Sequence, residues 1–166
     1  MSKIKLGMVG GGKGSFIGEV HRMAARLDDR YELIAGALSA DAKTAEESAL
    51  SLNLDKSRSY SSYETMAEVE SSLESGIDVV AIVTPNHLHA KIAEIFLSKG
   101  IHVICDKPLT TNLSDAEYLA SIVKKSGLIF TVTYNYSGYP MVRQAREMIQ
   151  NNDLGELRAV QIEYAQ

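Results

Sequence analysis

The chain has 166 residues, of which 45% are hydrophobic and 23% are charged, a composition typical of one globular domain with a substantial core. The formal net charge is −4, and Lys and Arg are scattered among acidic residues, so we expect no nucleic-acid partner. The longest apolar runs are only as long as strands, so we expect no membrane span.

Two features predict a cytoplasmic location. The first ten residues, MSKIKLGMVG, lack the long apolar run and the small-residue cleavage site of a signal peptide. The single cysteine, Cys105, excludes a disulfide within the chain. We therefore expect a cytoplasmic protein that acts on a small molecule.

Short apolar runs alternate with segments of helical periodicity along the whole chain. The runs are rich in Val and Ile and nearly continuous in apolar character, which is typical of strands buried on both faces. We expect strands at 4–10, 31–38, 78–83, 101–105 and 128–134, and helices at 18–28, 41–52, 62–75, 87–99, 114–126 and 140–150. Because strand–helix–strand repeats give parallel strands with right-handed crossovers, the predicted fold class is α/β, a doubly wound, mainly parallel sheet with helices on both faces.

Several residues agree with these helix ends. Ser114, with Glu117 three residues later, has the spacing of an N-terminal capping box. Gly76, Gly100 and Gly127 stand where glycines that end helices are expected. In a sheet of this kind ligands bind beyond the carboxyl ends of the strands, so functional residues are expected there.

The stretch GGGKGSFIG, residues 10–18, follows the first expected strand. Glycines here permit a tight turn and let backbone N–H groups approach a pyrophosphate, which the dipole of the next helix stabilises. Gly10 and Gly12 match the first two glycines of G-x-G-x-x-G, whereas the third would be Gly18, three residues late. A flexible glycine turn is the alternative, but the position after the first strand favours a nucleotide.

The second strand ends in ALSAD, residues 37–41, where an NAD-binding fold usually carries an acid that binds the ribose hydroxyls. Ser39 occupies the matching place. A hydroxyl tolerates a 2′-phosphate, and Lys43 lies one helical turn away to pair with it, so NADP is a candidate beside NAD. The alternative is that Ser39 and Asp41 only cap the next helix.

The third strand ends in TPNHLHA, residues 84–90, where Pro85 and Asn86 stop the strand and start a helix. His87 and His89 differ by two positions and so do not share a helical face, which argues against a metal site. By itself, His89 is more typical of a packed or capping histidine than of a ligand. The same holds for His21, expected to pack on the first helix, and for His102, within a strand.

The fourth strand runs into VICDKPLT, residues 103–110, which places Lys107 at the mouth of a buried strand. A partly buried ammonium there can hydrogen-bond a substrate oxygen and, if burial lowers its pKa, move a proton. The alternative is a solvated lysine before a turn. Cys105 is expected to be a small buried side chain and not a nucleophile.

In order along the chain, the glycine loop followed by GEVH, then TPNHLH, DKP and LGELRAVQIEY resemble the N-terminal half of the Gfo/Idh/MocA family of oxidoreductases. The resemblance implies a Rossmann NAD(P)-binding domain. It also implies that Lys107, the lysine of the family's E-K-P motif, is the catalytic residue beside the nicotinamide and the substrate hydroxyl. Asp106 replaces the motif's usual Glu, and the Lys107–Pro108 peptide bond is expected to be cis.

From the residues and the resemblance together we expect NAD or NADP as cofactor. Asn135 follows the last strand in TYNYSGYP and is the expected polar contact there, although the tyrosines of this stretch could equally seal a domain junction. The residues expected to contact the cofactor are Gly10, Gly12, Lys13, Gly14, Ser15, Phe16, Ile17, Gly18, Ser39, Lys43, Thr84, Pro85, Asn86, His89, Asp106, Lys107 and Asn135.

The final stretch, LRAVQIEYAQ, alternates between apolar and polar residues as a half-covered strand does. The resemblance implies that it opens a second α/β domain, so we expect a Rossmann domain at 1–150 and the start of a truncated substrate and oligomerisation domain at 151–166. The implied activity is a dehydrogenase acting on CH–OH of a sugar, inositol or related polyol. The alternative is a cofactor-binding module without turnover, and a homo-oligomer is expected only for the full-length protein.

Overall fold

The computed structural model describes residues 2–165 and divides into two compact units, the first ending at Thr133 and the second beginning at Tyr134. The first unit is built on one sheet whose five strands pair in the order β2-β1-β3-β4-β5, every pair parallel. The strands are β1 (Ile4–Gly10), β2 (Tyr31–Ala37), β3 (Val79–Val83), β4 (His102–Cys105) and β5 (Phe130–Val132). The predicted α/β fold with a parallel sheet is confirmed.

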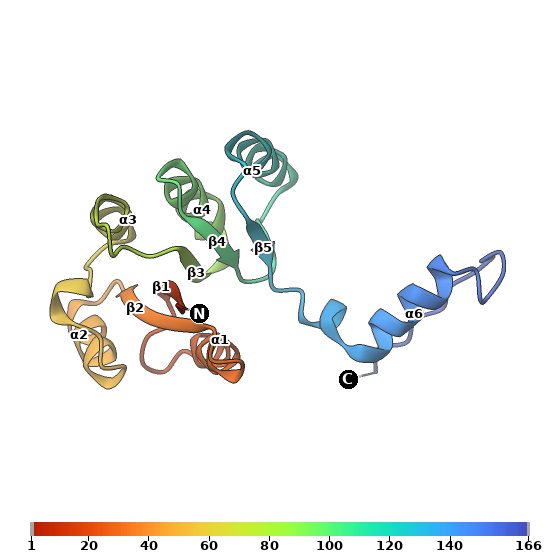
Figure 1. The fold of residues 1–166 in the computed structure, drawn as a ribbon, viewed down its shortest axis with the longest axis horizontal. Helices are drawn as coiled ribbons and strands as arrows, with labels where there is room; N and C mark the ends of the chain where they lie inside the picture. Colours follow the sequence, from red (N-terminus) through yellow and green to blue (C-terminus); the bar gives the residue numbers. More distant parts are fainter. Residues whose placement is uncertain (1, 166) are drawn as a thin grey trace. The chain divides into compact units, whose positions relative to one another are not determined.

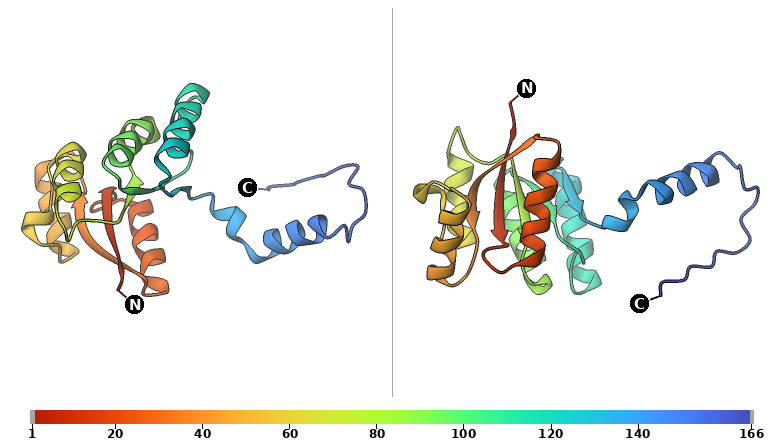
Figure 2. Two further views of the ribbon diagram at one scale, coloured as in Figure 1. Left: turned by 45° about the horizontal axis from the view of Figure 1, so that its top comes forward. Right: turned by 90° about the horizontal axis from the view of Figure 1, so that it is seen from below.

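Helices cover both faces of this sheet (Figures 1 and 2). They are α1 (Phe16–Leu27), α2 (Ala42–Ser51), α3 (Tyr63–Ser72), α4 (His89–Ser98) and α5 (Leu113–Ser126). Alternate residues of β3 point to opposite faces: Val80 and Ile82 join the core under α3, α4 and α5, whereas Val79, Ala81 and Val83 join the core on the side of α1 and α2. The sheet is thus buried on both faces, as its apolar runs predicted.

A short segment extends the sheet beyond β2. Ser59 forms an isolated parallel bridge with Gly36, and the N–H of Tyr60 donates to the carbonyl oxygen of Gly36 at 2.9 Å. The segment follows a single 3-10 turn, η1 (Lys56–Arg58). Residues 59–60 therefore stand where a sixth strand would lie, but they form too few sheet bonds to count as one.

The helix boundaries show two errors of the sequence analysis, at the N-cap of α5 and at Gly76. The N-cap of α5 is Asn112, whose side chain accepts from the N–H of Asp115 at 2.9 Å, so the expected Ser114–Glu117 capping box is wrong. Gly127 does end α5 in the left-handed region at φ 68°. Gly76 serves close packing instead, because a Cβ there would lie 1.9 Å from the carbonyl oxygen of Glu70.

The second unit contains η3 (Asn135–Gly138) and α6 (Pro140–Gln150). Residues 156–165 form no strand in the described structure, contrary to the strand expected there. A strand needs a second strand with which its backbone pairs. The apolar side chains of the alternating run are exposed, Ile162 at 85%. Gln166 lies outside the described residues, and the predicted domain boundary at residue 150 stays a prediction.

Candidate functional site

The loop after β1 is shaped by glycines with positive φ. Gly10, Gly11 and Gly14 adopt φ values of 77°, 73° and 83°, a region that side chains other than glycine rarely enter. Ser15 then caps α1, its hydroxyl accepting from the N–H of Gly18 at 3.3 Å. The loop therefore turns sharply from the strand into the N-terminus of a twelve-residue helix, the arrangement that binds phosphate groups.

Two glycines of the loop are needed for close packing. A Cβ on Gly18 would lie 2.4 Å from the Cα of Gly11, so α1 touches the turn at a place only glycine can occupy. A Cβ on Gly12 would lie 2.7 Å from the carbonyl oxygen of Leu38, so Gly12 packs against the end of β2. At Gly14, by contrast, a Cβ would meet no atom within 4 Å, so the open side of the loop lies at that residue.

Two residues that hold the loop were missed by the sequence analysis. The buried Ser48 of α2 accepts from the N–H of Lys13 at 2.8 Å. Arg22 of α1 donates from Nη1 to the carbonyl oxygen of Gly11 at 2.5 Å, and burial lowers the pKa of its guanidinium. Arg22 follows Gly18 by one helical turn, which is the one signal that could have indicated it. The ammonium of Lys13 pairs with Glu47 at 2.9 Å.

The end of β2 is organised by helix capping. Asp41 caps α2 by accepting from the N–H and the hydroxyl of Thr44 at 2.8 and 2.7 Å, and these hydrogen bonds lower the pKa of its carboxyl. Ser39 accepts from the N–H of Asp41 at 3.1 Å. The capping alternative is therefore correct for Asp41. Ser39, which is half-buried and uncharged, occupies the place after β2 where an acid was considered. Lys43 is exposed in the first turn of α2.

The end of β3 contains a buried hydroxyl with no partner. Thr84 Oγ1 is buried and makes no hydrogen bond to any residue between 2 and 165. A buried polar atom of this kind costs free energy unless a water or ligand satisfies it. Pro85 and Asn86 follow, both exposed, at the start of η2 (Asn86–Leu88). Thr84 also lies against the glycine loop, since a Cβ on Gly10 would be 3.0 Å from its Cγ2.

His89, at the start of α4, is only 1% exposed. Its Nδ1 lies 2.8 Å from the carbonyl oxygen of Pro108 and its Nε2 lies 3.0 Å from that of Thr84. Both ring nitrogens thus face protein oxygens, so no ring nitrogen is left for the cofactor contact expected of it. His89 instead ties the end of β3 to the segment after β4.

The end of β4 presents Lys107 to solvent. Lys107 is exposed, forms no ion pair among the described residues, and is joined to Pro108 by a cis peptide bond. The expected partial burial of this lysine is wrong, since the residue is exposed. Cys105 is fully buried, and burial raises the pKa of its thiol to about 12, so the thiol is not a nucleophile at neutral pH.

Asp106 is held by two residues distant in sequence. Its Oδ1 lies 3.5 Å from Nε2 of His21 and accepts from the hydroxyl of Thr133 at 2.9 Å. His21 therefore does more than pack on its own helix, as was expected of it. It connects α1 to the carboxyl end of β4.

The sheet register brings these strand ends together. Gly10 pairs with Val83, and Ile82 pairs with Cys105, so the glycine loop, Thr84 and Asp106 follow three adjacent strands. The sheet order reverses between β1 and β3, and such a switch point forms the crevice in which dinucleotides bind. The turn, the helix N-terminus and the unpartnered Thr84 hydroxyl fit a pyrophosphate-bearing cofactor.

Asn135 and its neighbouring tyrosines belong to the second unit. There the ring of Tyr136 contacts those of Tyr139 and Tyr164 edge-on, with centroids 5.4 and 6.0 Å apart, and the hydroxyls of Tyr136 and Tyr164 are 2.9 Å apart. The cofactor contact expected of Asn135 stays a prediction.

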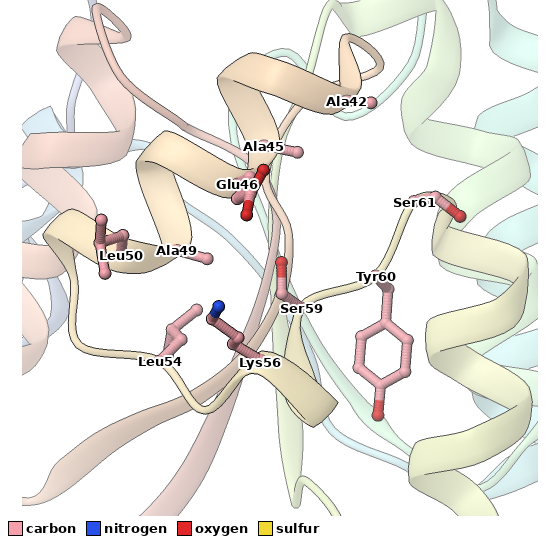
Figure 3. A pocket seen from close by; sticks show the side chains of 10 residues that line it. All are labelled: Ala42, Ala45, Glu46, Ala49, Leu50, Leu54, Lys56, Ser59, Tyr60 and Ser61. Atoms are coloured by element: carbon pink, nitrogen blue, oxygen red, sulfur yellow. The ribbon is translucent and has the colours of Figure 1, made fainter.

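A pocket of about 320 Å³ lies beside α2 (Figure 3). It opens between α2 and the 59–61 segment, and Ala45, Ala49, Leu54 and Tyr60 are among its lining residues. None of the residues expected to bind cofactor or substrate lines it.

Comparison with known proteins agrees with this geometry. Residues 4–134 match the family described as an oxidoreductase family with an NAD-binding Rossmann fold, Gfo/Idh/MocA. The chain belongs to this family. Its matched residues form the NAD-binding domain, which confirms the family and the NAD cofactor expected from the motifs.

Three relatives place the chain within the family. An uncharacterised oxidoreductase of Bacillus subtilis, YfiI, is 38% identical over 97% of this chain and 41% of its own length. The structure of an oxidoreductase from Sinorhizobium meliloti is 58% identical with a TM-score of 0.91, covering 95% of this chain and 44% of that one. An inositol dehydrogenase homologue from Azotobacter vinelandii, solved with NADH and myo-inositol, is 40% identical with a TM-score of 0.90, covering 95% of this chain and 41% of that one. The chain thus spans less than half the length of these relatives.

None of the helices between residues 2 and 165 combines the length and hydropathy needed to cross a bilayer. Over the same range, no three His, Cys, Asp or Glu side chains gather in a way that could hold a metal ion.

Proposed function

We propose that the protein carrying this domain is an NAD(P)-dependent dehydrogenase that acts on CH–OH of a sugar, inositol or related polyol. The observation that carries the proposal is the position of Lys107. It follows β4, one strand along from Thr84 and two from the glycine loop, at the carboxyl edge where the family's cofactor domain binds its ligand.

Each part of this edge has a distinct task in the proposal. The bound nicotinamide supplies the hydride acceptor. The N-terminus of α1 and the open side of the loop at Gly14 receive the pyrophosphate, and the Thr84 hydroxyl gains the partner that it lacks. The exposed ammonium of Lys107, unpaired within residues 2–165, holds the substrate hydroxyl oxygen and assists the movement of its proton.

The remaining predicted contacts are retained in the proposal, three of them with a different role. His89 acts by holding Thr84 and Pro108 in place, because both its ring nitrogens face their carbonyl oxygens. Gly12 and Gly18 act through close packing of the loop. The other expected contacts stay candidates for direct contact: Lys13, Ser15, Phe16, Ile17, Ser39, Lys43, Pro85, Asn86, Asp106 and Asn135.

The substrate class rests on a relative. The Azotobacter vinelandii homologue was solved with myo-inositol, which supports a cyclic polyol or sugar as the substrate of the protein that contains this chain. We propose further that residues 151–166 begin a second domain that completes the substrate pocket and the oligomer interface. By itself, the present chain would bind NAD(P) without turnover.

A direct assay separates the enzyme from a binding module. The complete protein is incubated with NAD or NADP and a panel of inositols and sugars. Formation of the reduced cofactor is followed by its ultraviolet absorbance. Cofactor reduction with one member of the panel supports the proposal. Saturable cofactor binding with no reduction by any inositol or sugar contradicts it and favours the binding module.

A further inference from the structure

Three side chains from three different elements meet at the carboxyl end of β4. His21 comes from α1, Asp106 follows β4, and Thr133 follows β5. The carboxylate Oδ1 of Asp106 accepts from the Thr133 hydroxyl at 2.9 Å and lies 3.5 Å from Nε2 of His21. We call these three residues the carboxylate cluster.

The cluster is largely shielded from water. The side chains of His21 and Asp106 are only 10% and 14% exposed. A carboxylate removed from water is costly unless hydrogen-bond partners satisfy it, and here the Thr133 hydroxyl and the His21 ring take that place. Their loss would leave Asp106 free to reorient towards solvent.

The backbone around Asp106 is also fixed. Its N–H donates to the carbonyl oxygen of Ile82 on β3 at 2.9 Å, and the N–H of Thr133 donates to the carbonyl oxygen of Cys105 at 3.0 Å. With main chain and side chain both held, Asp106 is the last anchored residue before the exposed Lys107. The conformation at Asp106 therefore sets where the lysine leaves the sheet.

The cluster also connects Lys107 to the glycine loop. His21 is followed on α1 by Arg22, whose Nη1 donates to the carbonyl oxygen of Gly11. Helix α1 thus contacts the glycine loop through Arg22 and Asp106 through His21. One helix therefore fixes the position of the glycine loop relative to the residue before Lys107.

We propose that His21 and Thr133 are positioning residues, which orient the Asp106 carboxylate and through it place Lys107 for proton transfer. The inference rests on the proposed dehydrogenase function only for its effect on rate. The placement itself can be measured in the absence of turnover.

The first experiment measures the placement in the present chain by NMR. Thr133→Val removes the hydroxyl and keeps the shape, whereas Thr133→Ser retains a hydroxyl. Thr131→Val, which removes an exposed hydroxyl from β5 two residues earlier, is the matched control. We expect Thr133→Val to move the Lys107 amide resonance and the ring resonances of His21, and Thr131→Val to move neither. Unchanged Lys107 and His21 resonances in a folded Thr133→Val chain would overturn the proposal, whether or not the complete protein proves to be an enzyme.

The second experiment measures rate in the complete protein. Thr133→Val should lower kcat about 10- to 100-fold, the range that a small misplacement of a reacting group produces, with the Kd of NAD within about twofold of wild type. Thr133→Ser should recover most of the rate. If Thr133→Val does not fold, His21→Leu compared with His21→Gln, which keeps a nitrogen donor, gives the same contrast.

The outcomes of the second experiment are distinct. A kcat equal to wild type, or a loss of NAD affinity that accounts for the loss of rate, overturns the positioning role while leaving the dehydrogenase function in place. A wild-type protein that turns over no substrate contradicts the proposed function instead, and the NMR comparison then decides the placement.

Discussion

Gly18 and Gly11 approach each other so closely that a Cβ added to Gly18 would lie 2.4 Å from the Cα of Gly11. The contact joins the first turn of α1 to the turn after β1, seven residues earlier in the chain. It explains why a glycine stands at position 18 although the spacing departs from the usual fingerprint. Its task is to let the helix approach the strand.

Gly18→Ala should therefore destabilise the fold by about 1–3 kcal/mol, because the added methyl group meets backbone atoms that cannot move aside easily. Urea denaturation measures the loss. Gly138→Ala is the control, since a Cβ there meets no atom within 4 Å and its φ is not positive. Equal stability of the Gly18→Ala chain and wild type would show that the approach is looser than described.

We expect the free energy of unfolding to fall at alkaline pH because of Tyr60. Its hydroxyl donates to the buried carboxylate of Glu70 at 2.6 Å, and burial together with this hydrogen bond raises the pKa of Tyr60 from 10.0 to about 12. Because the folded pKa is the higher one, the stabilisation is complete below pH 10 and is lost as the pH rises from 10 towards 12. Denaturation series from pH 8 upwards should show a steeper loss for wild type than for Tyr60→Phe, and parallel slopes would contradict the assignment.

We expect Ser39 to influence whether the domain prefers NAD or NADP. It stands uncharged after β2, and the nearby Asp41 carboxylate is engaged by Thr44. We expect the wild type to bind NADP at least as well as NAD, and Ser39→Asp to shift the ratio of the two Kd values towards NAD by repelling a 2′-phosphate. Ser39→Ala, which adds no charge, should leave the ratio nearly unchanged. A wild type that strongly prefers NAD would show that another residue sets the preference.

Lys107→Ala tests the proposed chemistry in the complete protein. Loss of acid–base assistance should lower kcat by about 10²- to 10⁴-fold, while the Kd of NAD changes little. Since Lys107 is exposed and makes no ion pair among residues 2–165, the melting temperature should stay the same. Lys124→Ala, which removes another exposed lysine, is the control. Normal turnover of the Lys107→Ala enzyme would refute the catalytic role.

Most of the fold could be predicted from the sequence because the residues that form each helix or strand are neighbours in the chain and show its periodicity. The strand at 4–10 and the helix at 140–150 match β1 and α6 at both ends, and the other four strands and five α-helices lie within three residues of their predicted bounds. The strand expected in the final stretch does not form. The edge segment at Ser59 was missed because a single bridge leaves no periodic signal. Asn112 was missed as a cap because Ser114 and Glu117, only two residues further along, offered the same local spacing.

The site was predicted where strand ends carry unusual residues, and it was missed where contacts depend on chain closure. Gly10, Thr84 and Lys107 each follow an apolar run, so their placement at one edge could be predicted. The approach of His21 to Asp106 joins residues 85 positions apart, and nothing in either local sequence indicates it. The same applies to Ser48, which reaches Lys13 across 35 positions.

The loop after β1 is the proposed cofactor-binding loop, and Gly14 is the position that tests this assignment most directly. A side chain at Gly14 meets no protein atom within 4 Å but would occupy the open side of the loop. Asn tolerates positive φ better than most residues, so Gly14→Asn should keep the fold. Gly127→Asn is the matched control, because Gly127 also has a positive φ, 68°, and open surroundings but lies at the end of α5.

Calorimetric titration of NAD into the wild-type chain and these two variants is the most direct measurement. We predict that Gly14→Asn weakens binding by about tenfold or more, equivalent to about 1.4 kcal/mol, while Gly127→Asn binds NAD as wild type does. Equal affinity of wild type and a folded Gly14→Asn chain would contradict the assignment of this loop to the cofactor.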